Sequence, residues 1–200
     1  MKKRLFFLVI AFISAVAANA DKDLIQGILQ YHCFDENMTA EVRLSDYNDT
    51  QEVDGVIPEQ IEVDGKTYTV TSIADNAFPY PMTGISMPST IKRIGRAAFQ
   101  NLPLRSIEWP SSLEVIEEDA FLGSELERVT LPEGLKEIGE QAFDDCNKLT
   151  EVNLPSTLKK IGNRAFCGCT ALTSILLPEH LESIGSGAFR RTGLTTLKFP

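Results

Sequence analysis

The stretch that decides the fold is Ile138-Gly139-Glu140-Gln141-Ala142-Phe143, completed after a short interval by Leu149-Thr150-Glu151-Val152-Asn153-Leu154-Pro155. Its Ala-Phe pair occurs at Ala77-Phe78, Ala98-Phe99, Ala120-Phe121, Ala142-Phe143, Ala165-Phe166 and Ala188-Phe189. Successive phenylalanines are therefore 21, 22, 22, 23 and 23 residues apart. A period this regular predicts a solenoid in which each repeat forms one coil.

Each repeat also contains a short strand pattern that ends in proline. The idealised form is Leu-x-x-Ile-x-Leu-Pro, represented by Leu149, Val152, Leu154 and Pro155. The three residues before the proline alternate between apolar and polar, which is typical of a half-buried strand. Proline has no N–H to donate to the ladder, so it ends the strand. We therefore expect one strand per repeat, and we call the surface that these strands form the strand wall.

A second apolar pair follows the proline and predicts another wall, which we call the returning wall. The pairs are Ile91/Ile94, Leu113/Ile116, Leu135/Ile138, Leu158/Ile161 and Leu181/Ile184. Glycine follows the isoleucine in four of these repeats, at Gly95, Gly139, Gly162 and Gly185. A tight turn there would require a residue free of Cβ clashes. The Ala-Phe pair closes the coil: one ring fills the interior, and the small alanine lets adjacent coils approach.

These patterns divide the chain into three segments. Residues 1–20 combine the basic start Lys2-Lys3-Arg4, an apolar run and Ala18-Asn19-Ala20, which predicts a secretory signal peptide cleaved after Ala20. Residues 21–70 lack the period and alternate apolar and polar residues, so they predict a small β-rich N-terminal cap that covers the first coil. Residues 71–200 predict a leucine-rich-repeat solenoid of about six repeats, β-rich, with short parallel strands and short helical or 3₁₀ turns.

The charge balance argues against two classes of partner. The chain has 28 acidic and 19 basic residues, for a formal charge of −9. Removal of residues 1–20 takes away three basic residues and leaves 28 against 16, a charge of −12. Nucleic acids and anionic membrane surfaces both bind clusters of Lys and Arg, so we expect neither as a partner of this acidic chain. No second apolar run of spanning length follows, and we expect no membrane span after signal cleavage.

The four cysteines belong to a chain that we expect in an oxidising compartment, where disulfides are permitted. Cys146 and Cys169 each follow the repeat phenylalanine by three residues, which places them on adjacent coils about 4.8 Å apart. That spacing allows a disulfide, while small buried thiols are the commoner arrangement. Cys167 and Cys169 do not have the spacing of a zinc pair.

No catalytic constellation stands out, and we expect neither an enzyme nor a cofactor or metal site. His32 and His180 lie far apart, and the repeat geometry brings no partner near either. The acidic groups Glu117-Glu118-Asp119 and Asp144-Asp145 fall at outer turns, where we expect solvated charges. Trp109, the single tryptophan, lies in an inward column, which favours core packing over a binding platform.

The pieces Ile-Gly-x-x-Ala-Phe, Cys-x-x-Leu and Leu-x-x-Val-x-Leu-Pro are clearest between Leu135 and Pro178, and the lead-in contains Val56-Ile57-Pro58 and residues 66–73. With them the chain resembles the BspA-like leucine-rich repeat proteins, a family of secreted and cell-surface bacterial proteins. The resemblance implies a right-handed solenoid of short parallel strands, a secreted or exported location at the cell surface or in the periplasm, and a role in adhesion or protein binding. It names no ligand, because fold does not imply function.

Binding must use what the solenoid exposes, and the outward positions of the strand wall differ from repeat to repeat. We predict a partner-binding wall made of Glu108, Arg128, Thr130, Glu151, Asn153, Ser174, Leu176, Thr196 and Lys198. The expected partner is a protein or glycan of a host matrix or a neighbouring cell surface. The alternative is a structural spacer segment of a larger surface or envelope protein, because the last repeat reaches Pro200 without a recognisable polar cap.

Overall fold

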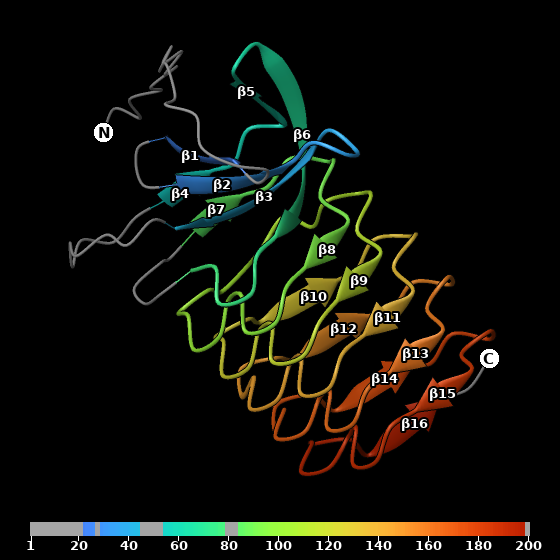
Figure 1. The fold of residues 1–200 in the computed structure, drawn as a ribbon. Helices are drawn as coiled ribbons and strands as arrows, with labels where there is room; N and C mark the ends of the chain where they lie inside the picture. The colour runs from blue at the N-terminus through green and yellow to red at the C-terminus, as the bar shows by residue number, and fades with distance from the viewer. Residues whose placement is uncertain (1–21, 27–28, 45–53, 79–83, 199–200) are drawn as a thin grey trace, which may run out of the picture.

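The protein is built from short β-strands that stack into a solenoid behind an N-terminal cap (Figure 1). The structure is a computed structural model, and it describes residues 22–26, 29–44, 54–78 and 84–198. The predicted signal peptide at residues 1–20 and the final Pro200 lie outside these ranges. The described residues contain sixteen strands and no helix.

The cap is a small mixed sheet, which confirms the predicted β-rich cap. Its strands are β1 (Lys22–Gln26), β2 (Leu29–Phe34), β3 (Thr39–Leu44), β5 (Gln60–Val63) and β6 (Lys66–Ile73). β1, β2 and β3 pair antiparallel, β5 and β6 form a hairpin, and β3 pairs parallel with β6. Tyr68 of β6 is fully buried and donates a hydrogen bond to Asp35. This bond is the main reason that the pKa of Tyr68 is raised to about 12.

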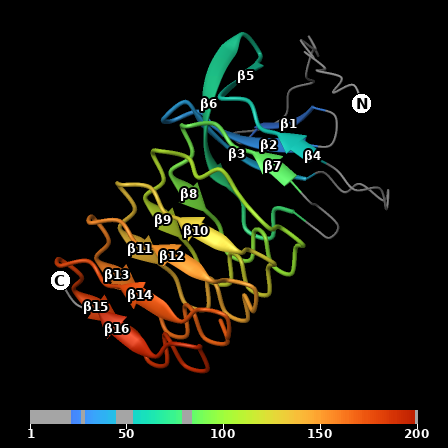
Figure 2. The same ribbon diagram turned by 180° about the vertical axis from the view of Figure 1, so that it is seen from behind.

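The returning wall is the continuous part of the solenoid. β6 serves both the cap and the first coil, and five two-residue strands follow it in parallel (Figure 2). They are β8 (Arg93–Ile94), β9 (Val115–Ile116), β11 (Glu137–Ile138), β13 (Lys160–Ile161) and β15 (Ser183–Ile184). Their isoleucines pair in register from one coil to the next. The cap and all returning strands therefore share one ten-stranded sheet.

The strand wall is interrupted. Its strands are β4 (Asp54–Val56), β7 (Gly84–Ser86), β10 (Arg128–Thr130), β12 (Glu151–Asn153), β14 (Ser174–Leu176) and β16 (Thr196–Lys198). They form three separate parallel pairs, β4–β7, β10–β12 and β14–β16.

One predicted strand of this wall is wrong, because residues 106–108 form no strand. We attribute the loss to Trp109, whose inward column elsewhere holds the smaller Leu131 and Leu154. Its indole packs edge-on against Phe121 and Phe143 of the next two coils, at centroid distances of 5.2 and 6.3 Å. Trp109 therefore packs against the core, as expected, but residues 106–108 beside it do not join the hydrogen-bonded ladder of the strand wall.

The phenylalanines of the Ala-Phe pairs form one stack through the interior. Neighbouring ring centroids lie 5.1 to 5.7 Å apart, and the ring planes deviate by 20° at most. Phe99, Phe121, Phe143 and Phe166 are fully buried, whereas Phe189 at the end is only partly buried. The repeated pair is thus the packing device of the fold.

The turns around these phenylalanines are not the short helical or 3₁₀ turns that we predicted. In the coil of Phe99, the N–H groups of Ala97, Phe99 and Asn101 donate to carbonyls of the next coil, while those of Ala98 and Gln100 donate within their own turn. A helix would need all of these donors for its own carbonyls. The residue two positions before each phenylalanine also has a φ between 52° and 65°, which ends a right-handed helix. These residues are Asn76, Ala97, Asp119, Gln141, Arg164 and Gly187.

The glycine column lets the coils approach closely. Gly139, Gly162 and Gly185 do not have positive φ. A Cβ on Gly162 would lie 2.5 Å from the backbone of the preceding coil, at the carbonyl carbon of Gly139. Glycine is therefore required by the contact between coils and not by the conformation of the turn.

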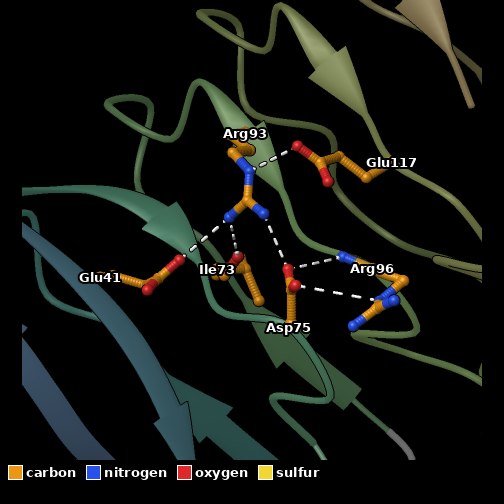
Figure 3. A network of polar contacts seen from close by, with 6 residues as sticks. All are labelled: Glu41, Ile73, Asp75, Arg93, Arg96 and Glu117. Atoms are coloured by element: carbon orange, nitrogen blue, oxygen red, sulfur yellow. Dashed lines mark hydrogen bonds and ion pairs between the residues drawn. The ribbon is translucent and has the colours of Figure 1, made fainter.

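Arg93 joins the cap to the first coils through a network of charges (Figure 3). Its guanidinium donates to Glu41 of β3 at 3.0 Å, to Asp75 at 2.7 Å and to Glu117 at 2.6 Å. Its bond to Glu117 contributes most to raising the pKa of Arg93. Burial opposes ionisation of Asp75, but hydrogen bonds from the Arg96 N–H and from Arg93 outweigh it and hold the pKa of Asp75 below its ordinary value. Glu117, expected at a solvated turn, is instead part of this network of charges.

The cysteine column is a ladder of buried thiols. Cys146 and Cys169 are not bridged. The thiol of Cys146 donates to the Phe121 carbonyl at 3.2 Å, and that of Cys169 donates to the Phe143 carbonyl at 3.1 Å. Burial raises the pKa of Cys146 to about 11. Each thiol therefore ties its coil to the preceding one without a covalent bond.

Candidate binding surface

The structure places most of the predicted wall residues on exposed, outward strand positions. Exposed side chains are those of Arg128, Thr130, Glu151, Asn153, Ser174, Leu176 and Thr196. Glu108 is also exposed, but it lies in the segment that forms no strand. Lys198 is the last residue of β16, and its side chain lies outside the described part of the structure.

Asn153 connects the outward side chains of β10 and β12. Its amide nitrogen Nδ2 donates to Thr130 Oγ1 at 3.3 Å and to Glu151 Oε1 at 3.1 Å. The register pairs Thr130 with Asn153 and Arg128 with Glu151. Because these groups are exposed, their bonds contribute little to stability, and their effect is to orient polar atoms on the wall.

A groove of about 820 Å³ lies over β12 and β14. Four predicted residues line it: Glu151 and Asn153 from β12, and Ser174 and Leu176 from β14. Leu176 is 57% exposed, so the groove contains a large apolar side chain in contact with solvent. The volume falls within the range of about 300–1,000 Å³ that ligand sites occupy.

The groove coincides with a break in the hydrogen-bonded ladder. β12 pairs only with β10, and β14 only with β16, so the facing edges of β12 and β14 are not joined in the described structure. The returning wall behind the groove is intact, because β13 pairs with both β11 and β15. The opening is therefore confined to one side of the solenoid.

Two further lining residues, Glu133 and Glu179, were not predicted. They follow the strand prolines, a column that the alternation argument did not consider. A sequence signal does mark the place. The strand leucine follows the phenylalanine by six positions in the two coils that carry β12 and β14, and by five in the coils before and after. An extra residue in two adjacent repeats thus coincides with the groove.

Not all of the acidic residues predicted at solvated turns are exposed. Asp144, predicted at a solvated turn, is 1% exposed and bonds Arg164 Nη2 of the next coil at 2.8 Å. The Asp144 charge is the main cause of the raised pKa of Arg164. Asp144 therefore has a structural role. No group of three or more His, Cys, Asp or Glu suited to a metal ion occurs among the described residues.

Within the described ranges, no helix is long and apolar enough to cross a membrane. The predicted signal peptide, from which we expect export, lies outside those ranges.

The fold and this surface define a class of protein, a β-rich repeat solenoid whose inward residues recur from coil to coil and whose outward residues differ. The BspA type leucine rich repeat region matches the chain in six copies, over residues 60–124 and 92–200. The chain therefore belongs to the BspA-type leucine-rich repeat family, which confirms the resemblance noted from its motifs. No curated protein matches the chain.

Solved structures of bacterial repeat proteins are similar to the chain. The pneumococcal vaccine antigen PcpA is 29% identical, with a TM-score of 0.79, and the match covers 92% of this chain and 51% of PcpA. A leucine-rich cell surface protein of Faecalibacterium prausnitzii is 27% identical, with a TM-score of 0.65 and coverage of 92% and 56%. A leucine-rich repeat protein of Bacteroides ovatus is 26% identical, with a TM-score of 0.57 and coverage of 86% and 58%. The chain spans between half and three-fifths of the length of these relatives.

Proposed function

We propose that this protein is a non-enzymatic, exported surface protein that binds a protein or glycan partner through its strand wall. The observation that carries the proposal is the groove over β12 and β14, which three outward polar residues of the wall line together with the exposed Leu176. Its similarity to a cell surface protein of F. prausnitzii supports the location.

The contrast between the two walls supports the choice of surface. The returning wall is one uninterrupted ladder, and several of its outward charges are used in pairs between coils, such as Lys136 with Glu114 at 2.6 Å. The strand wall has an incomplete ladder and a groove. Its outward side chains are thus more available to a partner.

The test compares two triple variants of the purified protein. The wall variant replaces Arg128, Asn153 and Leu176 by Ala, and the control replaces Glu137, Lys160 and Ser183 of the returning wall by Ala. Binding to immobilised host matrix proteins and mucin is measured by biolayer interferometry. We expect loss of binding for the wall variant alone. Equal binding by the wild type and both folded variants would exclude the strand wall as the adhesive surface.

The second candidate is a structural spacer, favoured by the single ten-stranded sheet that joins the cap to the last returning strand. A spacer requires a stiff connection and no ligand groove. It predicts that neither triple variant changes adhesion of cells that carry the protein.

A further inference from the structure

The described charged residues that line the groove are of one sign. Glu133, Glu151 and Glu179 line it, and within the described part of the chain no Lys, Arg or His does. Among the described contacts, Glu133 accepts hydrogen bonds from Ser156, through the backbone N–H at 3.2 Å and Oγ at 2.9 Å, and Glu151 accepts one from Asn153. None of the three carboxylates has a described ion pair.

Four glutamates elsewhere on the solenoid pair with lysines of neighbouring coils. The pairs are Lys136–Glu114 at 2.6 Å, Lys148–Glu125 at 2.8 Å, Lys159–Glu182 at 3.1 Å and Lys160–Glu137 at 3.7 Å. Other glutamates, such as Glu127 and Glu140, also lack a described ion pair. The groove brings three such carboxylates together, which makes a local excess of negative charge. Such a surface raises the local concentration of cations and steers basic partners to it.

The apolar part of the groove indicates a polypeptide. Leu176 is 57% exposed and Leu154 is partly buried beneath the same opening. An aliphatic side chain of a partner would remove both from water, which favours binding. Of the side chains that the structure describes, no aromatic one lines the groove to stack on a sugar ring. The combination of aliphatic and anionic groups thus favours a basic peptide over a glycan.

The spacing of two carboxylates sets a requirement on that peptide. Glu133 and Glu179 occupy equivalent positions two coils apart, which corresponds to about 9.6 Å along the stack at strand spacing. In a polyproline II segment, side chains three residues apart leave from the same face about 9.3 Å apart. Basic residues at every third position therefore match the two glutamates.

We propose that the groove over β12 and β14 binds an extended, cationic polypeptide segment, with Lys or Arg side chains at Glu133 and Glu179 and an aliphatic side chain on Leu176. The inference rests on the proposed function of the strand wall and names the partner class for it. The partner is recognised by charge and shape along one extended segment.

The test uses two synthetic peptides, three repeats of Lys-Pro-Leu and three repeats of Glu-Pro-Leu, with the purified protein in isothermal titration calorimetry. We expect binding of the lysine peptide alone, weakened by added salt. The double variant Glu133→Gln with Glu179→Gln should bind about three- to tenfold more weakly, the effect of losing two exposed ion pairs. Leu176→Ser should weaken binding as well.

The control is Glu114→Gln with Glu137→Gln, which removes the same charge from the returning wall and should change affinity less than about twofold. Circular dichroism and urea unfolding verify that each variant is folded. Equal weakening by both double variants would show nonspecific charge attraction and overturn the proposal. So would a sugar ligand whose binding depends on the groove glutamates while the lysine peptide does not bind.

The two proposals can fail separately. If the lysine peptide does not bind, but the triple wall variant still abolishes adhesion, the cationic-peptide proposal is wrong and the wall remains the binding surface. If the peptide binds in the groove and adhesion is unchanged in the triple variant, the groove proposal stands and the adhesive function is wrong.

Discussion

Replacing Phe143 by Ala should destabilise the solenoid more than the same truncation at the end of the stack. Its ring is fully buried, and it stacks between Phe121 at 5.3 Å and Phe166 at 5.2 Å. Losing the burial of the side chain costs about 1.5–3 kcal/mol. A residual cavity of about 80 Å³ would add about 2 kcal/mol at 24 cal/mol per Å³. We therefore expect the free energy of unfolding to fall by about 3–5 kcal/mol, the usual range for Phe→Ala.

Phe189→Ala is the matched control within the same column. Its ring is partly exposed and stacks on one neighbour only, Phe166 at 5.7 Å. It has no ring on its other side among the described residues, so its removal leaves an open depression and not a closed cavity. We expect the free energy of unfolding to fall by about 1 kcal/mol, because the ring is only partly removed from water in the folded protein.

Urea unfolding followed by circular dichroism measures both variants, with the midpoint and slope determined for each. Nearest-neighbour energetics also predicts that Phe143→Ala increases hydrogen exchange mainly in the two flanking coils. Equal losses for Phe143→Ala and Phe189→Ala, or a loss below about 1 kcal/mol for Phe143→Ala, would refute the stack as the main packing device.

Three further outcomes follow from the structure. Arg93→Lys should lower the free energy of unfolding, measured by urea unfolding, by about 1–2 kcal/mol, because an ammonium cannot replace the guanidinium among three carboxylates. The control Lys136→Met removes one exposed ion pair and should lower the free energy of unfolding by less than about 1 kcal/mol. Asp75 has a folded pKa below its unfolded value, so it stabilises the fold at neutral pH, and this contribution decreases as pH falls below about 4 towards the folded pKa. The difference between the urea midpoints of wild type and Asp75→Asn should therefore be smaller at pH 3 than at pH 7. The Cys146 thiol is buried and has a pKa of about 11. It should therefore resist alkylation at pH 8 in the native protein and react after unfolding, as measured by peptide mass spectrometry. Labelling of the native protein at the rate of the unfolded protein would contradict its burial.

The sequence predicted the fold well because the chain provides its own comparison. Six copies of the Ala-Phe pair, each with a strand pattern before a proline, determine which residues face inward. The stack of rings, the two walls and the cap all agree with that pattern. The helical turns were wrong because the period reveals which residues are buried but not where their N–H groups donate.

The candidate site was harder to predict, since it depends on differences between repeats. Alternation placed Glu151, Asn153 and Leu176 outward, but it gave no reason for the ladder to open between β12 and β14. Nor did it identify Glu133 and Glu179, which follow the strands. The missing strand at residues 106–108 also comes from a difference between repeats. We attribute it to one large side chain, Trp109, which stands where three other repeats have a leucine.

The two walls of the solenoid have different roles: the returning wall supplies continuous backbone pairing, and the strand wall contains the openings. Every buried backbone group needs a partner, and the returning wall meets this need in an unbroken ladder from β6 to β15. That ladder, together with the hydrogen bonds between the turns around the phenylalanines, keeps the coils in register. The strand wall can therefore lose pairing at residues 106–108 and between β12 and β14 without separating the coils. Openings and variable side chains therefore accumulate on the wall whose ladder is not needed for continuity, and the groove with Leu176 and its three glutamates lies there for that reason.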